Sequence, residues 1–178
     1  MEDSITPYQM YNKQDSEKRH LYVHRLLTRE FHDCVVTYDG QQGHDHCIQL
    51  DDFKLFIETK TCQPIIKTGK HYIPKGHPFI LDEPRLGRFK FDKRREKGPY
   101  AVSQHDDLVK CGGWYVFVVS NGNNRKIVFG IKASDLRLTD KPNIQRLAWP
   151  SVLVQCYPDW LQRLKANVYS GIIIEKDK

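Results

Sequence analysis

Long hydrophobic runs are missing from this chain of 178 residues. No apolar stretch approaches the roughly 18 residues that a membrane-spanning helix requires. The polar start, residues 1–14, has no apolar segment of the kind that a secretory signal contains. Internal repeats and low-complexity tracts are also missing. These absences argue against membrane-spanning and repeat architectures, and we expect a single domain without membrane association.

Cysteine is scarce, odd in number and scattered. No two cysteines are spaced as Cys-x-x-Cys, so the pattern argues against both a disulfide scaffold and a structural zinc site. We expect free thiols in a reducing, cytoplasmic setting instead. The five residues are Cys34, Cys47, Cys62, Cys111 and Cys156.

Hydrophobic residues make up 39% of the chain, which is enough for a packed core and argues against disorder. The 28 Lys and Arg residues exceed the 22 Asp and Glu residues and give a formal net charge of +6. This basic balance favours a polyanionic partner such as nucleic acid, but it does not identify one without a motif.

The periodicity of apolar residues predicts an α/β fold with a mixed central β-sheet flanked by helices. Residues 1–15 are expected to form a loose N-terminal arm. A first helix is expected over residues 17–31, with Ser16 as its N-cap, because the apolar residues from Val23 to Phe31 follow a helical spacing.

Strand-like segments follow the first helix. Residues 46–50 and 54–61 are predicted to form a hairpin around the Asp51-Asp52 turn. Residues 114–120 are apolar throughout, which predicts a strand at the centre of the sheet. The remaining predictions are strands at 34–38 and 126–131, a helix at 104–111 capped by Ser103, a last helix opened by Pro158, and an edge strand at 171–174.

The predicted core spans residues 16–136, and residues 137–178 form a C-terminal extension packed on it. Within the core, residues 63–99 are rich in proline, glycine and charge and read as an insertion. Long loops inside compact domains are usually functional or mobile. In this insertion, residues 88–92 alternate charged and aromatic side chains as an edge strand does. We expect substrate choice to depend on the insertion and the extension.

The side chains with the most chemistry lie on the predicted hairpin. Glu58 and Lys60 share one face of a strand, and a buried charged pair there favours a cleft with a metal ion. The hairpin brings Asp45 alongside Glu58. Two carboxylates and the backbone carbonyl of Thr59 make a hard oxygen site, which suits Mg²⁺ better than Zn²⁺. The ion would orient a water and hold a phosphate oxygen, while Lys60 would stabilise developing charge or position the water.

This arrangement resembles the PD-(D/E)-x-K signature of the restriction-endonuclease-like nuclease superfamily. Asp45 precedes Glu58-Thr59-Lys60 by 13 residues (58 − 45), and His44 stands where the motif has proline. The resemblance covers about residues 16–136 and is close to archaeal Holliday junction resolvases and small type II restriction enzymes. It implies a restriction-endonuclease-like core and a magnesium-dependent endodeoxyribonuclease, with Mn²⁺ able to substitute for Mg²⁺.

The resemblance also implies roles for residues outside the hairpin. Gln104 corresponds to a glutamine that faces the site from the helix after the motif. Glu17 corresponds to a first-helix glutamate that adds a metal contact in some members. Members that cut duplex or branched DNA usually act as homodimers, so we expect a homodimer here. The last helix, with Trp160 and Leu164, is the candidate dimer surface.

The densest basic run of the chain lies in the insertion, where Phe89 and Phe91 are interleaved with the cations. We interpret it as a loop that follows DNA phosphates beside the active site, and His44 is a further candidate phosphate contact. The predicted DNA-binding residues of this run are Arg85, Arg88, Lys90, Lys93, Arg94, Arg95 and Lys97.

Several alternatives remain at this stage. The hairpin charges could be solvated on a surface and have no role, or one of the turn residues Asp51 and Asp52 could replace Asp45 as metal ligand. A zinc site at His44, His46 and Cys47 is disfavoured, because adjacent strand residues face opposite ways. For function, the alternatives are a junction resolvase, a DNA-binding module without catalysis, and a protein-interaction domain with an incidental basic loop.

Overall fold

The computed structural model describes residues 7–38, 44–67, 84–93, 103–120, 126–140 and 143–176. In chain order its elements are α1 (Pro7–Glu30), β1 (Val35–Tyr38), β2 (His46–Leu50), β3 (Phe53–Cys62), β4 (Ile65–Lys67), β5 (Pro84–Leu86), β6 (Arg88–Asp92), α2 (Gln104–Lys110), β7 (Trp114–Ser120), β8 (Lys126–Lys132), the 3-10 turn η2 (Ala133–Asp135), β9 (Ile144–Ala148), α3 (Trp149–Leu153) and α4 (Trp160–Lys176).

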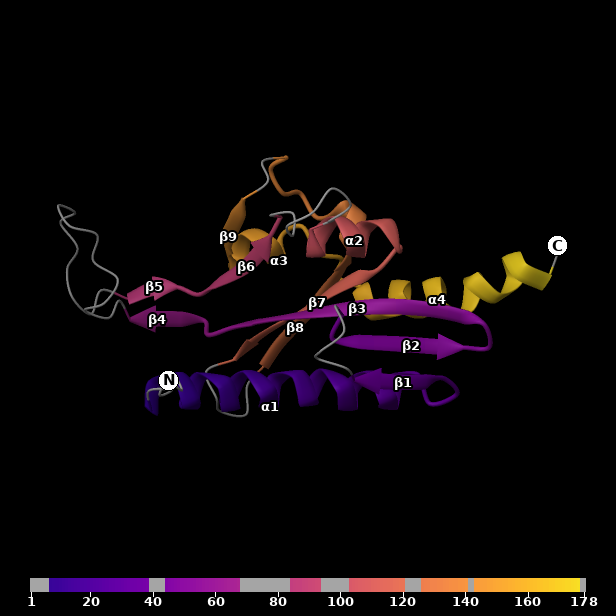
Figure 1. Cartoon of the computed structure of the whole chain (residues 1–178), viewed down its shortest axis with the longest axis horizontal. Coiled ribbons are helices and arrows are strands. Elements are labelled where there is room, and N and C mark those ends of the chain that lie inside the picture. The colour runs from indigo at the N-terminus through magenta and orange to yellow at the C-terminus, as the bar shows by residue number, and fades with distance from the viewer. Residues whose placement is uncertain are drawn as a thin grey trace, which may run out of the picture.

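A five-stranded mixed sheet of order β1-β2-β3-β7-β8 forms the centre of the molecule (Figure 1). The β3–β7 pair is parallel, and the other three pairs are antiparallel. The predicted mixed α/β architecture is therefore confirmed. Strand β7 is buried along its whole length, as its apolar sequence predicts, but the central position belongs to β3. The prediction of a central β7 was wrong because burial on both faces does not fix a strand's place in the order.

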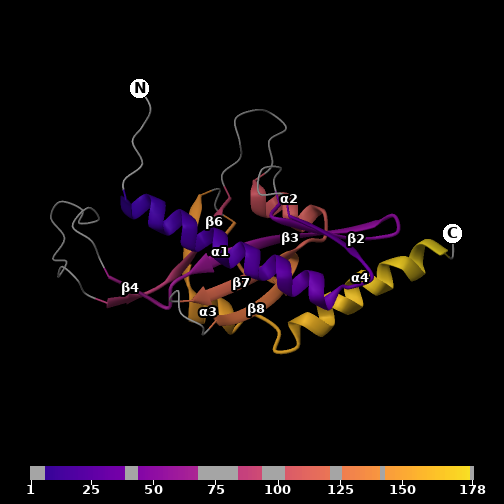
Figure 2. The same ribbon diagram turned by 90° about the horizontal axis from the view of Figure 1, so that it is seen from below.

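Helices α1 and α4 cover one face of the sheet. Figure 2 shows α1 crossing the strands with α4 beside its C-terminal end. Lys165 of α4 pairs with Glu30 at 2.8 Å, and the Trp114 indole N–H of β7 donates to Asn167 of α4 at 2.8 Å. Helix α2 and a small second sheet, β6–β9, cover the opposite face (Figure 1).

The parallel register of β3 and β7 determines which of their side chains lie on the face that α2 and the β6–β9 sheet cover. Glu58 lies opposite Tyr115, and Lys60 lies opposite Phe117, so these four side chains share a face. Phe89 of β6 packs on Phe117 with ring centroids 4.8 Å apart. The β6–β9 sheet is thereby fixed on the same side of the central sheet as Glu58 and Lys60.

Two predicted boundaries were wrong. Helix α1 begins at Pro7, so residues 7–15 are helical and Ser16 lies inside the helix, where its hydroxyl is 3.5 Å from that of Thr61. Residues 171–174 continue α4 and do not form an edge strand. The isoleucines of this segment lose less than about 1 kcal/mol each in a helix, so a helix already packed through its earlier turns can continue through them.

The C-terminal segment also contains elements that the sequence did not reveal, β9 and α3. In addition, Trp160 and Leu164 of α4 pack into the chain's own core, with 8% and 0% of their surface exposed. The proposed dimer surface was therefore wrong, because this apolar face is used within the chain. Within the described residues, no helix is both long enough and apolar enough to span a membrane.

Candidate active site

Glu58 occupies the middle of β3, and the residue is 4% exposed. One of its carboxylate oxygens, Oε1, accepts hydrogen bonds from Lys60 Nζ at 2.7 Å and from Gln104 Nε2 at 3.0 Å. Gln104 Oε1 in turn accepts from Lys60 Nζ at 3.1 Å. Three of the four predicted catalytic residues therefore form one closed hydrogen-bonded triangle.

The position of Gln104 depends on the start of α2. The Ser103 side chain accepts from the Asp106 backbone N–H at 3.2 Å, which caps the helix as predicted. The helix ends at Lys110, and Gly112, just beyond the C-cap, has a φ of 70° that few other residues adopt. Because both ends of this seven-residue helix are fixed, Gln104 reaches Glu58 from its first turn.

The carboxyl group of Glu58 is unusual in its protonation and its bonding. Its pKa is raised to about 7, mainly by burial and also by the nearby Asp45 carboxylate, against the opposing effect of the Lys60 ammonium. The second oxygen, Oε2, is buried and has no hydrogen-bond partner among the described residues. A buried carboxylate oxygen without a partner is costly, so this atom is suited to a bound cation.

Asp45 lies immediately before β2 and faces the β3 backbone. Its Oδ2 atom accepts the Thr59 backbone N–H at 2.8 Å. The antiparallel register pairs His46, the first residue of β2, with Ile57. Just before β2 begins, the Asp45 side chain therefore replaces a backbone acceptor for β3. The N–H and C=O of one strand residue point to the same edge, so the Thr59 carbonyl also lies on the Asp45 side.

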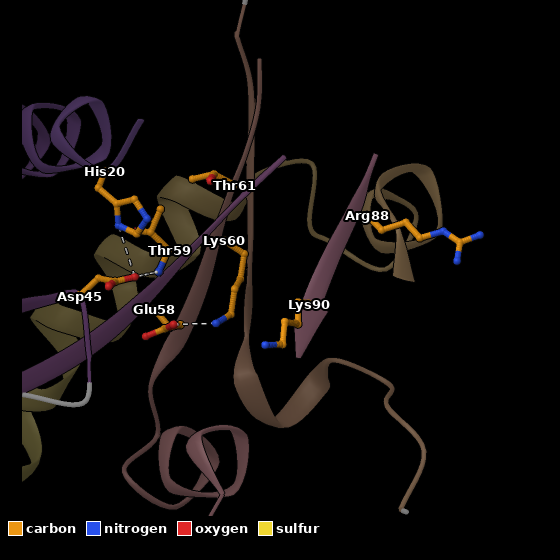
Figure 3. Close-up of a pocket in the computed structure, with 8 residues that line it drawn as sticks. All are labelled: His20, Asp45, Glu58, Thr59, Lys60, Thr61, Arg88 and Lys90. Carbon is orange, nitrogen blue, oxygen red and sulfur yellow. Dashed lines mark hydrogen bonds and ion pairs between the residues drawn. The ribbon is translucent and has the colours of Figure 1, made fainter. Parts of the chain in front are cut away.

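Asp45, Glu58 and Lys60 line a common pocket of about 340 Å³, much larger than the roughly 30 Å³ that one water occupies. Figure 3 shows Glu58 and Lys60 side by side, with Asp45 next to Thr59 and His20. The full lining is His20, Asp45, Glu58, Thr59, Lys60, Thr61, Arg88 and Lys90. The pocket therefore combines two carboxylates with three cationic side chains.

His20 of α1 is a site residue that the sequence analysis missed. Its Nδ1 atom is 3.5 Å from Asp45 Oδ2, and it is buried without a hydrogen-bond partner in the described structure. Burial lowers the pKa of His20, and the Asp45 carboxylate opposes this shift. A signal did exist, because His20 precedes Val23 and Leu27 at helical spacing and so belongs to the inward face of α1.

Glu17, the predicted metal contact of the first helix, is exposed and lies one turn before His20. Its side chain makes no hydrogen bond or ion pair with the other described residues, and it does not line the pocket. Its proposed role stays a prediction. His44 is turned toward α2, where its Nε2 atom is 3.2 Å from Asp107 Oδ2, so a phosphate would have to compete with this carboxylate.

The predicted basic run is divided by the structure. Arg88 and Lys90 line the pocket, and Figure 3 shows the Lys90 ammonium on the side of Lys60 while the Arg88 head group points away. Lys93 donates to the Thr139 backbone carbonyl at 2.9 Å. Arg85 is half-buried on β5 and has an interaction of its own. Arg94, Arg95 and Lys97 lie outside the described residues.

Two alternatives for the hairpin are wrong. The exposed turn Asp51-Asp52 lies at the far end of β2–β3 from Glu58, about 20 Å along the strand, so neither residue can share an ion with Glu58. The hairpin charges are also not generally solvated, because the Glu58 and Lys60 side chains are only 6% and 16% exposed.

The zinc alternative also lacks support. His46 faces α1, where it stacks on His24 at 5.9 Å, while His44 faces α2. Within the described ranges, no group of three or more His, Cys, Asp or Glu side chains is placed to hold a metal. Two carboxylates and a carbonyl suit Mg²⁺, which usually keeps several waters and binds through one or two carboxylates plus substrate phosphate.

No protein-family model matches the chain, and no curated protein matches its sequence. The chemistry of the pocket is therefore the main indication of function.

Proposed function

We propose that the chain is a magnesium-dependent endodeoxyribonuclease with a restriction-endonuclease-like core. One observation carries the proposal. The buried Glu58 carboxylate is held through Oε1 by Lys60 and Gln104, while Oε2 is left without a partner in a pocket that Asp45 also lines. An acid, an amine and an amide arranged in this way fit phosphodiester hydrolysis better than a structural ion pair, which would satisfy both oxygens.

The order of the elements supports the same proposal. A helix and a strand precede the hairpin that carries Asp45 and Glu58, and α2 then presents Gln104 to Glu58 before the parallel strand β7. This is the arrangement that the resemblance to the PD-(D/E)-x-K nucleases implies. The assignment to that superfamily remains part of the proposal.

In this mechanism Asp45 and Glu58 would hold the cation, together with the Thr59 carbonyl. Bound Mg²⁺, or Mn²⁺ in its place, supplies Lewis-acid activation of a water and of a phosphate oxygen. Lys60 holds its proton beside the Glu58 carboxylate and donates to the charge that develops on the phosphate in the transition state. Gln104 keeps Lys60 and Glu58 Oε1 together, which leaves Oε2 for the cation.

The proposal is tested with supercoiled plasmid and with a synthetic four-way junction, each incubated with Mg²⁺, with Mn²⁺ or with EDTA. We expect cleavage with either cation and none with EDTA. Glu58→Ala should abolish cleavage while DNA binding in EDTA is retained. Cleavage in EDTA, or full activity of Glu58→Ala, would refute the proposal.

The same experiment separates the possible substrates. Cleavage of the plain duplex supports a restriction-type or specialised endonuclease, which the large insertion and extension favour, since a minimal resolvase needs neither. Preference for the junction supports a structure-specific resolvase instead. The expected homodimer, with one site per strand, is tested by light scattering coupled to size-exclusion chromatography.

A further inference from the structure

A small basic sheet flanks the candidate active site. Strands β6 and β9 pair antiparallel, with Arg88 opposite Ala148 and Lys90 opposite Arg146. Directly opposed residues share a face, as do residues two apart on one strand. Arg88, Lys90 and Arg146 are all exposed, so they form one outward surface, which we call the basic face.

The side chains on the inner side of the β6–β9 sheet pack on the central sheet, and this packing makes the basic face point toward solvent. Phe89 and Phe91 alternate with the two β6 cations, and each is 1% exposed. Phe89 packs on Phe117, and Phe91 meets Tyr115 edge-on with ring centroids 5.5 Å apart. A one-residue slip of β6 would bury cations and expose both phenylalanines, so the orientation of the face is strongly specified.

The β6–β9 sheet is also fixed to the segment just after β3, the strand that carries Glu58. The Trp149 backbone N–H donates to Gly87 O at 3.0 Å, and its indole N–H donates to Pro64 O, just after β3, at 3.0 Å. Gly87 approaches this segment so closely that a Cβ atom would lie 1.7 Å from the Gln63 carbonyl oxygen. The basic face therefore has a set position relative to Glu58.

The charges of the basic face are not balanced within the described chain. Like charges directly opposed across two strands are destabilising, and Lys90 and Arg146 form such a pair. The side chains of Lys90, Arg146 and Arg88 make no hydrogen bond or ion pair with another described residue, although their backbones belong to the β6–β9 ladder. The acid at the end of β6, Asp92, has an interaction of its own. Lys90 lines the acid pocket, Arg88 lies two residues away on the same strand, and Arg146 lies directly opposite Lys90. A polyanion that extends out of the pocket past Lys90 would therefore run along the basic face.

We propose that the basic face binds the phosphate backbone of the DNA strand on its way into the active site, with Arg146 as a phosphate contact from the C-terminal segment. The identity of the polyanion as DNA rests on the proposed function. Contacts to phosphates position the strand and carry no sequence information. The C-terminal segment therefore takes part in binding the substrate and is more than a cover for the core.

The test is the salt dependence of DNA binding, measured by fluorescence anisotropy with a labelled duplex in EDTA, so that no cleavage occurs. Each phosphate contact contributes about 0.9 to the slope of log K against log salt concentration for duplex DNA. We expect Arg146→Ala and Lys90→Ala each to lower the slope by about 1, and Arg146→Lys to retain it. Arg25→Ala is the matched control, because Arg25 is exposed on α1, across the central sheet, and should leave the slope unchanged.

The outcomes separate this inference from the proposed function. If the wild type cleaves DNA but Arg146→Ala has the same salt slope as Arg25→Ala, the proposed role of the basic face is refuted and the nuclease proposal stands. A lower slope in Arg146→Ala without any metal-dependent cleavage would support the basic face and refute the nuclease. Binding to anionic lipid vesicles in place of DNA would also overturn the inference. Circular dichroism melting checks that these surface variants remain folded.

Discussion

The two ends of the β2–β3 hairpin carry the same kinds of side chain in different surroundings. The turn end has Asp51, Asp52 and Lys54, all exposed. The opposite end, which we call the acid end, has Asp45, Glu58 and Lys60, all buried or half-buried and all lining one pocket. Two acids and a lysine near one hairpin are therefore not sufficient for a site.

Cover by other elements accounts for the difference. At the acid end, α2 supplies Gln104 and β6 supplies Lys90, and α1 adds His20 from the other face of the sheet. Removal of water strengthens every charge interaction among these groups, and it raises the pKa of Glu58. At the turn end, solvent screens the charges, so neighbouring acids and amines have little effect on one another.

The largest contrast is expected for the acids. Asp45→Asn keeps an oxygen that can accept the Thr59 N–H but removes one of two ligand charges. We expect Mg²⁺ binding to fall below detection by titration calorimetry and cleavage to fall at least about 10³-fold, since lost metal activation is worth several kcal/mol. Asp52→Asn removes the same charge from the turn end and should change neither quantity. Equal behaviour of the two variants would contradict the assignment of Asp45.

The two lysines of β3 give a narrower contrast. Lys60→Ala should lower kcat by about 10²–10³-fold, as expected when one preorganised donor to the transition state is lost. It should not weaken Mg²⁺ binding, because the variant removes a positive charge next to the Glu58 carboxylate. Lys54→Ala, on the same face of β3, should leave kcat and Mg²⁺ binding unchanged. Loss of metal binding in Lys60→Ala would show that the lysine organises the site and does not act on the phosphate.

The local patterns of the acid end could be read from the sequence. Alternation along β3 predicts that Glu58 and Lys60 share a face, and the paired apolar segments predict the hairpin. The cap at Ser103 predicts the start of α2, whereas the approach of Gln104 to the site was expected only from the resemblance. These predictions succeeded because each depends on residues that are neighbours in the chain.

The features that the sequence did not reveal depend on distant contacts. His20 is a site residue because α1 crosses β3 beside Asp45, and no spacing in the chain specifies that crossing. The pairing of Lys90 with Arg146 joins segments more than 50 residues apart, and short strands such as β9 have too few residues for a clear alternation. Residues 171–174 continue α4, a helix that is already packed on the core through its earlier turns.

A smaller difference between the two ends of the hairpin is expected in the pH dependence of Mg²⁺ binding. Because the pKa of Glu58 is about 7 in the folded chain, its proton must leave before Mg²⁺ binds. The apparent affinity for Mg²⁺ should therefore rise about tenfold per pH unit up to about pH 7 and then level off. Calorimetry in buffers of different ionisation enthalpy should detect release of about one proton per Mg²⁺ at pH 6 and close to none at pH 8.5.

The raised pKa of Glu58 also predicts how the free energy of unfolding changes with pH, and this can be measured without metal. The pKa of Glu58 is raised from its ordinary 4.5 in the folded chain, so the folded state binds more protons than the unfolded state between these two values. The free energy of unfolding should therefore fall as pH rises from about 4.5 to about 7, and added Mg²⁺ should restore it above pH 7. Asp52→Asn should show the same curve as the wild type, whereas Glu58→Gln should flatten this part of it.

In the calorimetry, a proton release that is equal at pH 6 and pH 8.5 would show that Glu58 is already ionised in the folded chain. The two ends of the hairpin would then differ less than the structure indicates.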